Sequence, residues 1–571
     1  MKIPKLLLSA GVVAFGLFAL VHVADVALGR PILPWGDFPW ILDPKIPPAT
    51  LRLHAVRDVL CYSLLAVVPV CLFGRWARLV LVPGFCCAVV LDVAVYATYA
   101  TYHASLGELW PTVFLNSSAE EALQFLKMSL TPDVLKGLFA LLVVLVAGSV
   151  LIAKAHYPRV SRRSVALGLA LLLPFAVCHL FLTEPRYGIR EMAYADFAVR
   201  SALTWTRLKG IGQACSGNPQ LPERLACAAA DEQRPNVVIV LGESASRNYW
   251  HLYGYARQTT PRMDALCREG NGGVCFRDVV SVHGETTEAI CMLLSDVSFD
   301  NPTVGHWTLA EVYQRAGYRG TLITNQFLWK FEKDLLLARI FNGCVARVNV
   351  PEEFPQDEKT YDERTVALLK RELERTPDRP QLVFVHLAGA HFPVEKANPK
   401  SENHFSDAVE GDVLADLAQA PEARDRCNRY DNAMLYEDKV LGQLVDVVKS
   451  ASRRPACLVY LSDHGESPRA GSWRDYANDD LYEVPCVLWF SESYQKAFPD
   501  VVASARRAAT RPMQSDEMTC GLIELGRITG LPNVRPEQSF LNDGFRGRHP
   551  RKVDKGRRTY AKDILPREQR P

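Results

Sequence analysis

The sequence predicts an α-helical transmembrane domain followed by an α/β sandwich, and three observations lead to this fold class. Residues 1–182 are dominated by Leu, Val and Ala, whereas the rest of the 571-residue chain has the mixed composition of a soluble enzyme. In that second part, apolar strand-like segments alternate with stretches of helical periodicity, which is typical of helices packed on a mostly parallel sheet. The net charge of +2 gives no reason to expect a nucleic-acid partner.

Apolar runs in the first third of the chain predict a bundle of about five membrane-spanning helices. Some runs are shorter than the ~20 residues that an upright helix needs, so their ends are set only to within several residues. The first run follows Lys2 and Lys5 and also fits a cleaved signal peptide, but the later runs favour a multi-span anchor. The runs cover residues 6–28, 59–73, 79–99, 138–153 and 165–182.

Basic residues orient this predicted anchor. Arg75 and Arg78 lie between the second and third runs, and a second basic group lies between the fourth and fifth. Under the positive-inside rule, both loops and the N-terminus are cytoplasmic. Five spans then place everything after residue 182 outside the cytoplasm. The second basic group consists of Lys154, Arg159, Arg162 and Arg163.

The cysteines are compatible with an exported domain. Ten of the 15 lie after residue 182, and an even number in an oxidising compartment suggests disulfides. Cys267 and Cys275 flank a Gly-rich turn and form the predicted local pair. Cys457 and Cys486 lie within predicted core strands, which favours the alternative that several thiols are free and buried.

The second part of the chain begins after a linker rich in Gly, Pro and polar residues (209–234). In parallel sheets, functional groups gather just past the carboxyl ends of the strands. Two predicted strands end in this way, because Glu243 follows one and Asp463 and His464 follow another. The predicted strands are 237–241, 321–324, 382–387, 457–461 and 484–490, and the predicted helices are 308–316, 362–373 and 432–448.

These strand ends carry the side chains of a metal site. Two carboxylates and an imidazole would hold Zn²⁺ with a fourth position open. In "HGETTEAICMLLSD" (283–296), Thr286 and Thr287 precede a helical run, whose free N–H groups favour a phosphoryl group. A threonine hydroxyl needs a base or a metal to become a nucleophile at neutral pH. Each pattern alone is also that of an ordinary turn or helix cap, and their coincidence at one sheet edge indicates metal-dependent chemistry.

At these residues the sequence resembles the membrane-anchored phosphoethanolamine transferases of the alkaline phosphatase and sulfatase superfamily. The resemblance spans nearly the whole chain and implies an α/β/α sandwich of the alkaline-phosphatase/sulfatase type after the helical bundle. It is carried by "VVIVLGESASRNYWHLYGYARQTTPRMDAL" (237–266), "FVHLAGAHFP" (384–393), "NRYDNAMLYEDKVLGQLV" (428–445), "YLSDHGES" (460–467) and "VPCVLWFS" (484–491).

The resemblance implies a reaction and a metal. Glu243, Asp463 and His464 would surround one tightly held zinc ion together with Thr286, the implied nucleophile, with Thr287 as the alternative and a second metal left open. The protein would take phosphoethanolamine from phosphatidylethanolamine, release diacylglycerol and pass the group to an envelope glycolipid, glycan or protein. We expect a monomeric, multi-pass protein of the bacterial inner membrane with its catalytic domain in the periplasm.

Substrate contacts are implied at two further places. His391 would contact phosphoethanolamine or a second metal, unless it is a simple strand-end histidine, whereas His386 inside the strand is expected to be structural. "FLNSSAEEALQFL" (114–126) resembles a segment thought to meet the lipid headgroup, through Asn116 and either Glu120 or Glu121. An apparent one-residue insertion leaves those two glutamates equivalent, and an interfacial amphipathic helix without a ligand role is the alternative.

One departure from the family pattern affects the residue expected to make the second contact with substrate or metal. Family members usually carry another histidine before the "VPCVLWFS" strand, but "SPRAGSWRDYANDDLYEVP" (467–485) has none and the next histidine is His549. Asp475, Asn478 or Asp479 are the candidates to replace it, or the site works with a single zinc.

These interpretations divide the chain into four parts and leave three rival functions. The parts are a transmembrane domain (1–182), a linker (183–235), a periplasmic catalytic domain (236–546) and a basic tail (547–571) that is either mobile or faces anionic lipid. The rivals are a phosphoglycerol transferase using phosphatidylglycerol, a membrane-anchored phosphatase or sulfatase, and an inactive binding protein. Arg247 with the Leu-Tyr-Gly-Tyr pattern argues against the first, and a threonine nucleophile against a sulfatase.

Overall fold

The computed structural model describes most of residues 66–102, 132–181 and 221–564, together with short stretches such as 201–206. Within the last range the longer gaps are 299–306, 327–339, 407–413 and 471–474. The chain forms two compact units. The N-terminal unit comprises Met1–Ala100 and Ala104–Trp205, and the C-terminal unit comprises Thr101–His103 and Thr206–Pro571.

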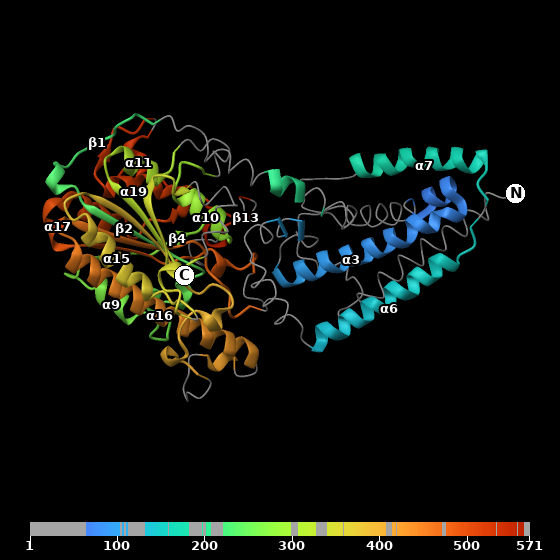
Figure 1. Ribbon diagram of the computed structural model, residues 1–571, viewed down its shortest axis with the longest axis horizontal. Helices are drawn as coiled ribbons and strands as arrows, with labels where there is room; N and C mark the ends of the chain where they lie inside the picture. The colour runs from blue at the N-terminus through green and yellow to red at the C-terminus, as the bar shows by residue number, and fades with distance from the viewer. Residues whose placement is uncertain are drawn as a thin grey trace. The chain divides into compact units, whose positions relative to one another are not determined.

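The described residues of the N-terminal unit are helical apart from those of the connection at 155–161 (Figure 1). Its long helices coincide with the third, fourth and fifth predicted apolar runs, and the first run lies outside the described residues. Among the described residues, one helix, Ala66–Leu91, is long and apolar enough to cross a membrane, and Leu141–Lys154 is a shorter apolar helix. The elements are η1 (Gly74–Ala77), α3 (Arg78–Tyr102), α6 (Pro132–Lys154) and α7 (Arg162–Phe181).

The C-terminal unit is built on a seven-stranded sheet of order β3-β9-β8-β2-β7-β5-β6. The five strands from β8 to β6 run parallel, and β9 and β3 form an antiparallel edge. All five predicted strands are present, and two edge strands, β3 and β6, are additional. The strands are β2 (Asn236–Gly242), β3 (Gly273–Phe276), β5 (Arg319–Thr324), β6 (Cys344–Asn349), β7 (Gln381–His386), β8 (Ala456–Ser462) and β9 (Cys486–Phe490).

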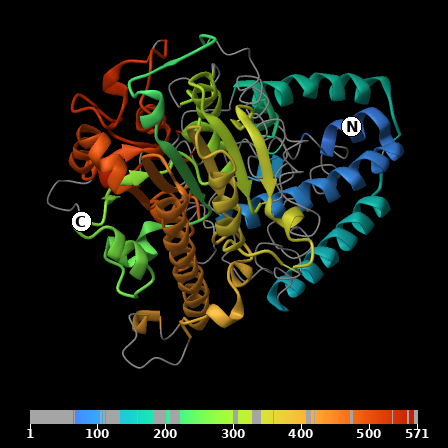
Figure 2. The ribbon, with the colours of Figure 1, turned by 60° about the vertical axis from the view of Figure 1, so that its left-hand side comes forward.

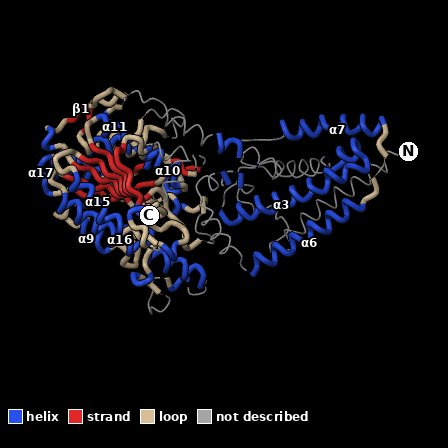
Figure 3. Tube along the Cα trace, in the orientation of Figure 1, coloured by secondary structure: helices blue, strands red, loops and turns tan. Residues whose placement is uncertain are grey.

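Helices enclose this sheet (Figure 3), and α16 is the long helix that lies along it in Figure 2. Thr308 and Glu311 form a capping box at the start of α11, whereas α9, α16 and α18 begin with Pro. The helices are α9 (Pro261–Leu266), α10 (Thr286–Leu293), α11 (Leu309–Arg315), α14 (Val350–Glu353), α15 (Arg364–Arg375), α16 (Pro421–Ala451), α17 (Glu492–Ala497), α18 (Pro499–Ala508), α19 (Thr519–Leu525) and α20 (Ala561–Ile564).

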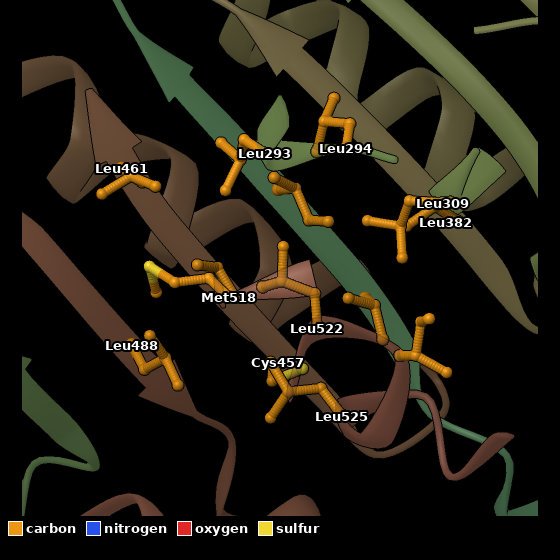
Figure 4. Packing of buried hydrophobic residues seen from close by; sticks show 14 of the residues in the cluster. Leu293, Leu294, Leu309, Leu382, Cys457, Leu461, Leu488, Met518, Leu522 and Leu525 are labelled. Atoms are coloured by element: carbon orange, nitrogen blue, oxygen red, sulfur yellow. The ribbon is translucent and has the colours of Figure 1, made fainter. Parts of the chain in front are cut away.

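The central strands are apolar on both faces because both faces are covered. In β2, Val237 and Ile239 belong to one buried cluster, whereas Val238 and Val240 belong to the other. The first cluster includes side chains of α10, α11 and α19, as Figure 4 shows for Leu293, Leu309 and Leu522. The second includes side chains of α9, α15 and α16. The period-2 alternation of β2 therefore anchors the strand that precedes Glu243 between two hydrophobic layers.

The predicted disulfide between Cys267 and Cys275 is wrong. All 12 cysteines whose side chains the structure describes are free. Cys275 lies in β3 near Tyr253, whose hydroxyl donates to the Cys486 carbonyl oxygen at 3.0 Å. Burial raises the pKa of the Cys267 thiol to about 12. Cys457 and Cys486 are fully buried in β8 and β9, as the alternative expected. These thiols act as small apolar side chains of the core.

The segment expected to be a basic tail folds onto the C-terminal unit between residues 548 and 564. Arg551 is only 2% exposed and pairs with Asp278 and Asp563, each at 2.8 Å. Arg558 pairs with Asp479 at 2.7 Å. Arg551 and Arg558 are therefore used in ion pairs within the fold. Short strand pairs complete the unit: β1 (Ala226–Cys227) with β11 (Ile528–Thr529), β4 (Val279–Val280) with β10 (Met513–Gln514), and β12 (Lys552–Val553) with β13 (Arg558–Thr559).

We predict that Arg551→Met lowers the free energy of unfolding by about 3 kcal/mol, because the substitution leaves buried carboxylate charge without its partner. Arg507→Met is the matched control, since Arg507 pairs with Asp543 at the surface and its loss should cost at most about 1 kcal/mol. Denaturant unfolding of the full-length protein in detergent measures both. Equal losses for the two variants would show that the C-terminal segment adds nothing to the core.

Candidate active site

Parallel strand register brings together two of the predicted metal ligands. Gly242 of β2 pairs with Ser462 of β8, so the next residues, Glu243 and Asp463, leave the sheet side by side. Both are almost completely buried, as is His464. One ligand atom from each of the three residues lies within 4.8 Å of the others. These three residues are called the acid–histidine cluster below.

Hydrogen bonds within the loop after β8 aim the ligand atoms of this cluster. His464 Nδ1 lies 2.8 Å from the carbonyl oxygen of Gly465, so Nδ1 carries the ring proton and Nε2 presents its lone pair. Nε2 lies 3.5 Å from Glu243 Oε1 and 3.5 Å from Asp463 Oδ2. Asp463 Oδ1 accepts from two backbone amides, whereas the buried Oδ2 makes no hydrogen bond. Burial raises the pKa of the Asp463 carboxyl.

Thr286 places a fourth candidate ligand atom, its hydroxyl oxygen, beside the cluster. It is the first residue of α10, and its Oγ1 lies 3.1 Å from Glu243 Oε2 and 3.4 Å from His464 Nε2. Thr287 is 4% exposed and makes none of these contacts. Of the two candidate hydroxyls, only that of Thr286 therefore faces the acid–histidine cluster, beside the N-terminal amides of α10.

The residues of the cluster fit a zinc ion. Two carboxylates buried next to each other repel unless a proton or a cation neutralises one of them. The free Asp463 Oδ2 and the outward lone pair of His464 Nε2 both point at the space shared with Glu243. Two oxygens, one nitrogen and a hydroxyl make a four-ligand donor set that zinc accepts.

Three residues that support Glu243 were not identified from the sequence. Gln326 Nε2 donates to Glu243 Oε2 at 2.9 Å and to the Leu387 carbonyl at 3.0 Å. Ser244 Oγ donates to Glu243 Oε1 at 2.7 Å. The Asp362 carboxylate accepts from the amides of residues 388 and 389, both at 2.8 Å. Gln326 lies two residues after β5, so the strand-end rule that identified Glu243 applied to it as well.

The two histidines of the 384–393 segment have different environments. His386 is buried in β7, and burial lowers its pKa to about 4, so it is neutral at physiological pH. His391 is exposed on the following turn, where its Nδ1 lies 2.7 Å from the Phe392 carbonyl oxygen. The turn itself reaches the cluster, because the Ala390 amide donates to the Glu243 carbonyl at 3.0 Å.

The three residues considered as replacements for the missing histidine have local partners. Asp479 pairs with Arg558 at 2.7 Å. The side chains of Asp475 and Asn478 accept hydrogen bonds from the amides of residues 477 and 480. Asn116, Glu120 and Glu121 lie outside the described residues.

Comparison with known proteins identifies the family of this fold. A family model described as Sulfatase matches residues 235–526, a range that starts before β2 and includes every residue of the acid–histidine cluster. The chain belongs to the sulfatase family. Among curated proteins, it is 25% identical to phosphoethanolamine transferase EptC of Escherichia coli K12, over 78% of this chain and 80% of that one. It is 26% identical to phosphoethanolamine transferase CptA of Salmonella typhimurium, over 86% and 87%.

Solved structures agree with this sulfatase-family assignment. The C-terminal periplasmic domain of E. coli EptC, in complex with Zn, matches with a TM-score of 0.54 at 27% identity, over 61% of this chain and 99% of that one. The full-length lipooligosaccharide phosphoethanolamine transferase A from Neisseria meningitidis matches with a TM-score of 0.64 over 93% of this chain, and at 19% identity it supports the fold alone. The predicted resemblance to phosphoethanolamine transferases is confirmed.

We predict that Gly389→Ala lowers the free energy of unfolding more than Gly530→Ala does. Gly389 has φ +49°, and an added Cβ would come 2.5 Å from the Glu243 carbonyl oxygen. The left-handed backbone costs a non-glycine residue about 1–2 kcal/mol, and the clash adds to it. Gly530→Ala is the control, since Gly530 has φ +78° but open space around it. Unfolding free energies measure the difference, and equal losses would mean that the 388–390 turn yields without strain.

Proposed function

We propose that this protein transfers phosphoethanolamine from phosphatidylethanolamine to an acceptor in the cell envelope, through a phosphothreonine formed at Thr286. The observation that carries the proposal is the position of Thr286 Oγ1, 3.1 Å from Glu243 Oε2 and 3.4 Å from His464 Nε2 at the start of α10. The names of the relatives EptC and CptA support the transferred group, and the Zn complex of the EptC domain supports zinc as the metal.

The zinc would be held by Glu243, Asp463 and His464. When bound, it lowers the pKa of the Thr286 hydroxyl. The Thr286 oxygen then forms a bond to phosphorus, the bond from phosphorus to the glycerol oxygen breaks, and diacylglycerol leaves with one proton. In the second step the acceptor hydroxyl oxygen bonds to phosphorus, the bond from phosphorus to Thr286 Oγ1 breaks, and the proton of the acceptor hydroxyl passes to Oγ1. The amides at the N-terminus of α10 face the phosphoryl oxygens and favour their charge.

The N-terminal unit would hold the protein in the membrane that contains the donor lipid. Large apolar side chains are exposed on α6, among them Phe139, Leu142 and Leu151, which is favourable in lipid and costly in water. The Lys154 and Arg162 ends of α6 and α7 would face the cytoplasm, leaving the C-terminal unit in the periplasm of the inner membrane.

The remaining substrate contacts belong to the proposal as well. His391 would approach the transferred group from the 388–391 turn. Asn116 and Glu120 or Glu121 would approach the donor headgroup. The acceptor is an envelope glycolipid, a glycan or a protein, and a single chain suffices for both steps.

We predict a phosphoethanolamine adduct on the peptide that contains Thr286 after full-length protein in detergent is incubated with phosphatidylethanolamine. The adduct should disappear in Thr286→Ala, because of the two threonine hydroxyls at the start of α10 only that of Thr286 contacts the acid–histidine cluster, and persist in the buried control Thr287→Val. Peptide mass analysis measures it.

Three outcomes would contradict the proposal. A glycerophosphate adduct formed from phosphatidylglycerol would make the protein a phosphoglycerol transferase. Free phosphoethanolamine released without an acceptor would make it a hydrolase. An adduct that survives Thr286→Ala would remove Thr286 from the reaction.

A further inference from the structure

Ser244 follows Glu243 directly and has an unfavourable backbone conformation. Its φ is +61°, in the left-handed region that side chains rarely adopt. This conformation costs a non-glycine residue about 1–2 kcal/mol, and it persists only where the surroundings enforce it. A glycine at this position would adopt the left-handed backbone without that energy cost. Both the presence of a serine side chain and the contacts that keep its backbone left-handed therefore need an explanation.

The turn at Ser244 directs two donors at the acid–histidine cluster. Its backbone N–H donates to Asp463 Oδ1 at 3.1 Å, and its Oγ donates to Glu243 Oε1 at 2.7 Å. One residue thereby binds an oxygen of each carboxylate in the cluster. Asp463 Oδ2 is left without a hydrogen bond and free for a cation. The left-handed turn, in place of a continued strand, allows one residue to reach both carboxylates.

Besides Asp463, two side chains bind the backbone of this turn: Ser462 Oγ accepts from the Ala245 amide at 3.0 Å, and Tyr430 binds on both sides of that residue. The Tyr430 hydroxyl donates to the Ser244 carbonyl oxygen at 2.6 Å and accepts from the Ser246 amide at 2.7 Å. Tyr430 is fully buried on α16, and its ring packs edge-on against Tyr249 at 5.0 Å. The hydroxyl therefore bridges the two peptide groups on either side of Ala245 from a helix that packs on the sheet.

We propose that Tyr430 is a positioning residue for the metal site: its hydroxyl holds Ser244 in the left-handed conformation, and Ser244 in turn orients Glu243 and Asp463. This inference rests on the proposed zinc site. It gives a role to Tyr430, the first of the two tyrosines in the "NRYDNAMLYEDKVLGQLV" segment. Groups that orient metal ligands in this way typically change metal affinity 10–100-fold when they are removed.

The test compares Tyr430→Phe with Tyr436→Phe in full-length protein. Tyr436 is buried on the same helix, but its hydroxyl makes no hydrogen bond to the turn after β2. Zinc affinity, measured by competition with a chromophoric chelator, should fall about tenfold or more in Tyr430→Phe and stay unchanged in Tyr436→Phe. The visible spectrum of the Co²⁺-loaded protein, which reports ligand geometry, should change only in Tyr430→Phe. Unchanged affinity and an unchanged spectrum would overturn the proposal.

Hydrogen exchange of the metal-free protein separates this inference from the proposed function. The amides of residues 243–247 should exchange faster in Tyr430→Phe than in the parent protein, whether or not zinc binds. A parent protein without zinc affinity would defeat the proposed function, and the exchange rates would still decide the role of Tyr430.

A second variant covers the case in which Tyr430→Phe does not fold. Ser244→Ala removes the hydroxyl that binds Glu243 without touching α16. We expect about tenfold weaker zinc binding from it, and an unchanged affinity would overturn the link from Ser244 to the cluster.

Discussion

Two carboxylates buried side by side are the constraint around which the C-terminal unit is arranged. Glu243 and Asp463 leave adjacent parallel strands at the same level, with almost no exposure to water. Their mutual repulsion is strong in a medium of low dielectric constant, and only donors, a proton or a cation relieve it. The surrounding donors occupy three of their four oxygens, from Ser244, Gln326, Thr286 and the backbone. The unbonded Asp463 Oδ2 and the lone pair of His464 define where a cation belongs.

Residues next to the two carboxylates allow close packing around them and limit the negative charge nearby. Gly242 lets β2 pass the Tyr460 ring, because an added Cβ would come 2.5 Å from its hydroxyl. That hydroxyl donates to Glu437 on α16, whose pKa is raised to about 8 mainly by burial. Glu437 is therefore mostly protonated at neutral pH and adds little negative charge behind the cluster. Asp362 holds the turn that packs against the Glu243 backbone.

Short sequence patterns were enough to predict the cluster residues, because each of them directly follows a buried strand. Buried parallel strands appear as short apolar runs, and their ends identified Glu243, Asp463 and His464. Among the supporting residues, Gln326 also follows the end of a strand, whereas Tyr430 could not be found in this way, since it reaches Ser244 across 186 positions of the chain. The edge strands β3 and β6 were missed from the sequence. β3 has only four residues, and the first four side chains of β6 alternate between partly buried and exposed, so neither forms a buried apolar run.

The expected disulfide and the expected C-terminal tail were not found, because composition and spacing do not show which side chains a residue contacts in the fold. Cys267 and Cys275 have a spacing suited to a disulfide, but one ends α9 and the other lies in β3 beside Tyr253. The basic residues after 547 suggested a tail, yet Arg551 and Arg558 meet carboxylates more than 70 positions away, on Asp278 and Asp479.

The most direct measurement is anomalous diffraction at the zinc absorption edge from crystals of the full-length protein. The account predicts one strong peak among Glu243, Asp463 and His464, within bonding distance of Thr286 Oγ1. Density for zinc elsewhere, or none at this cluster in crystals grown with excess zinc, would contradict it.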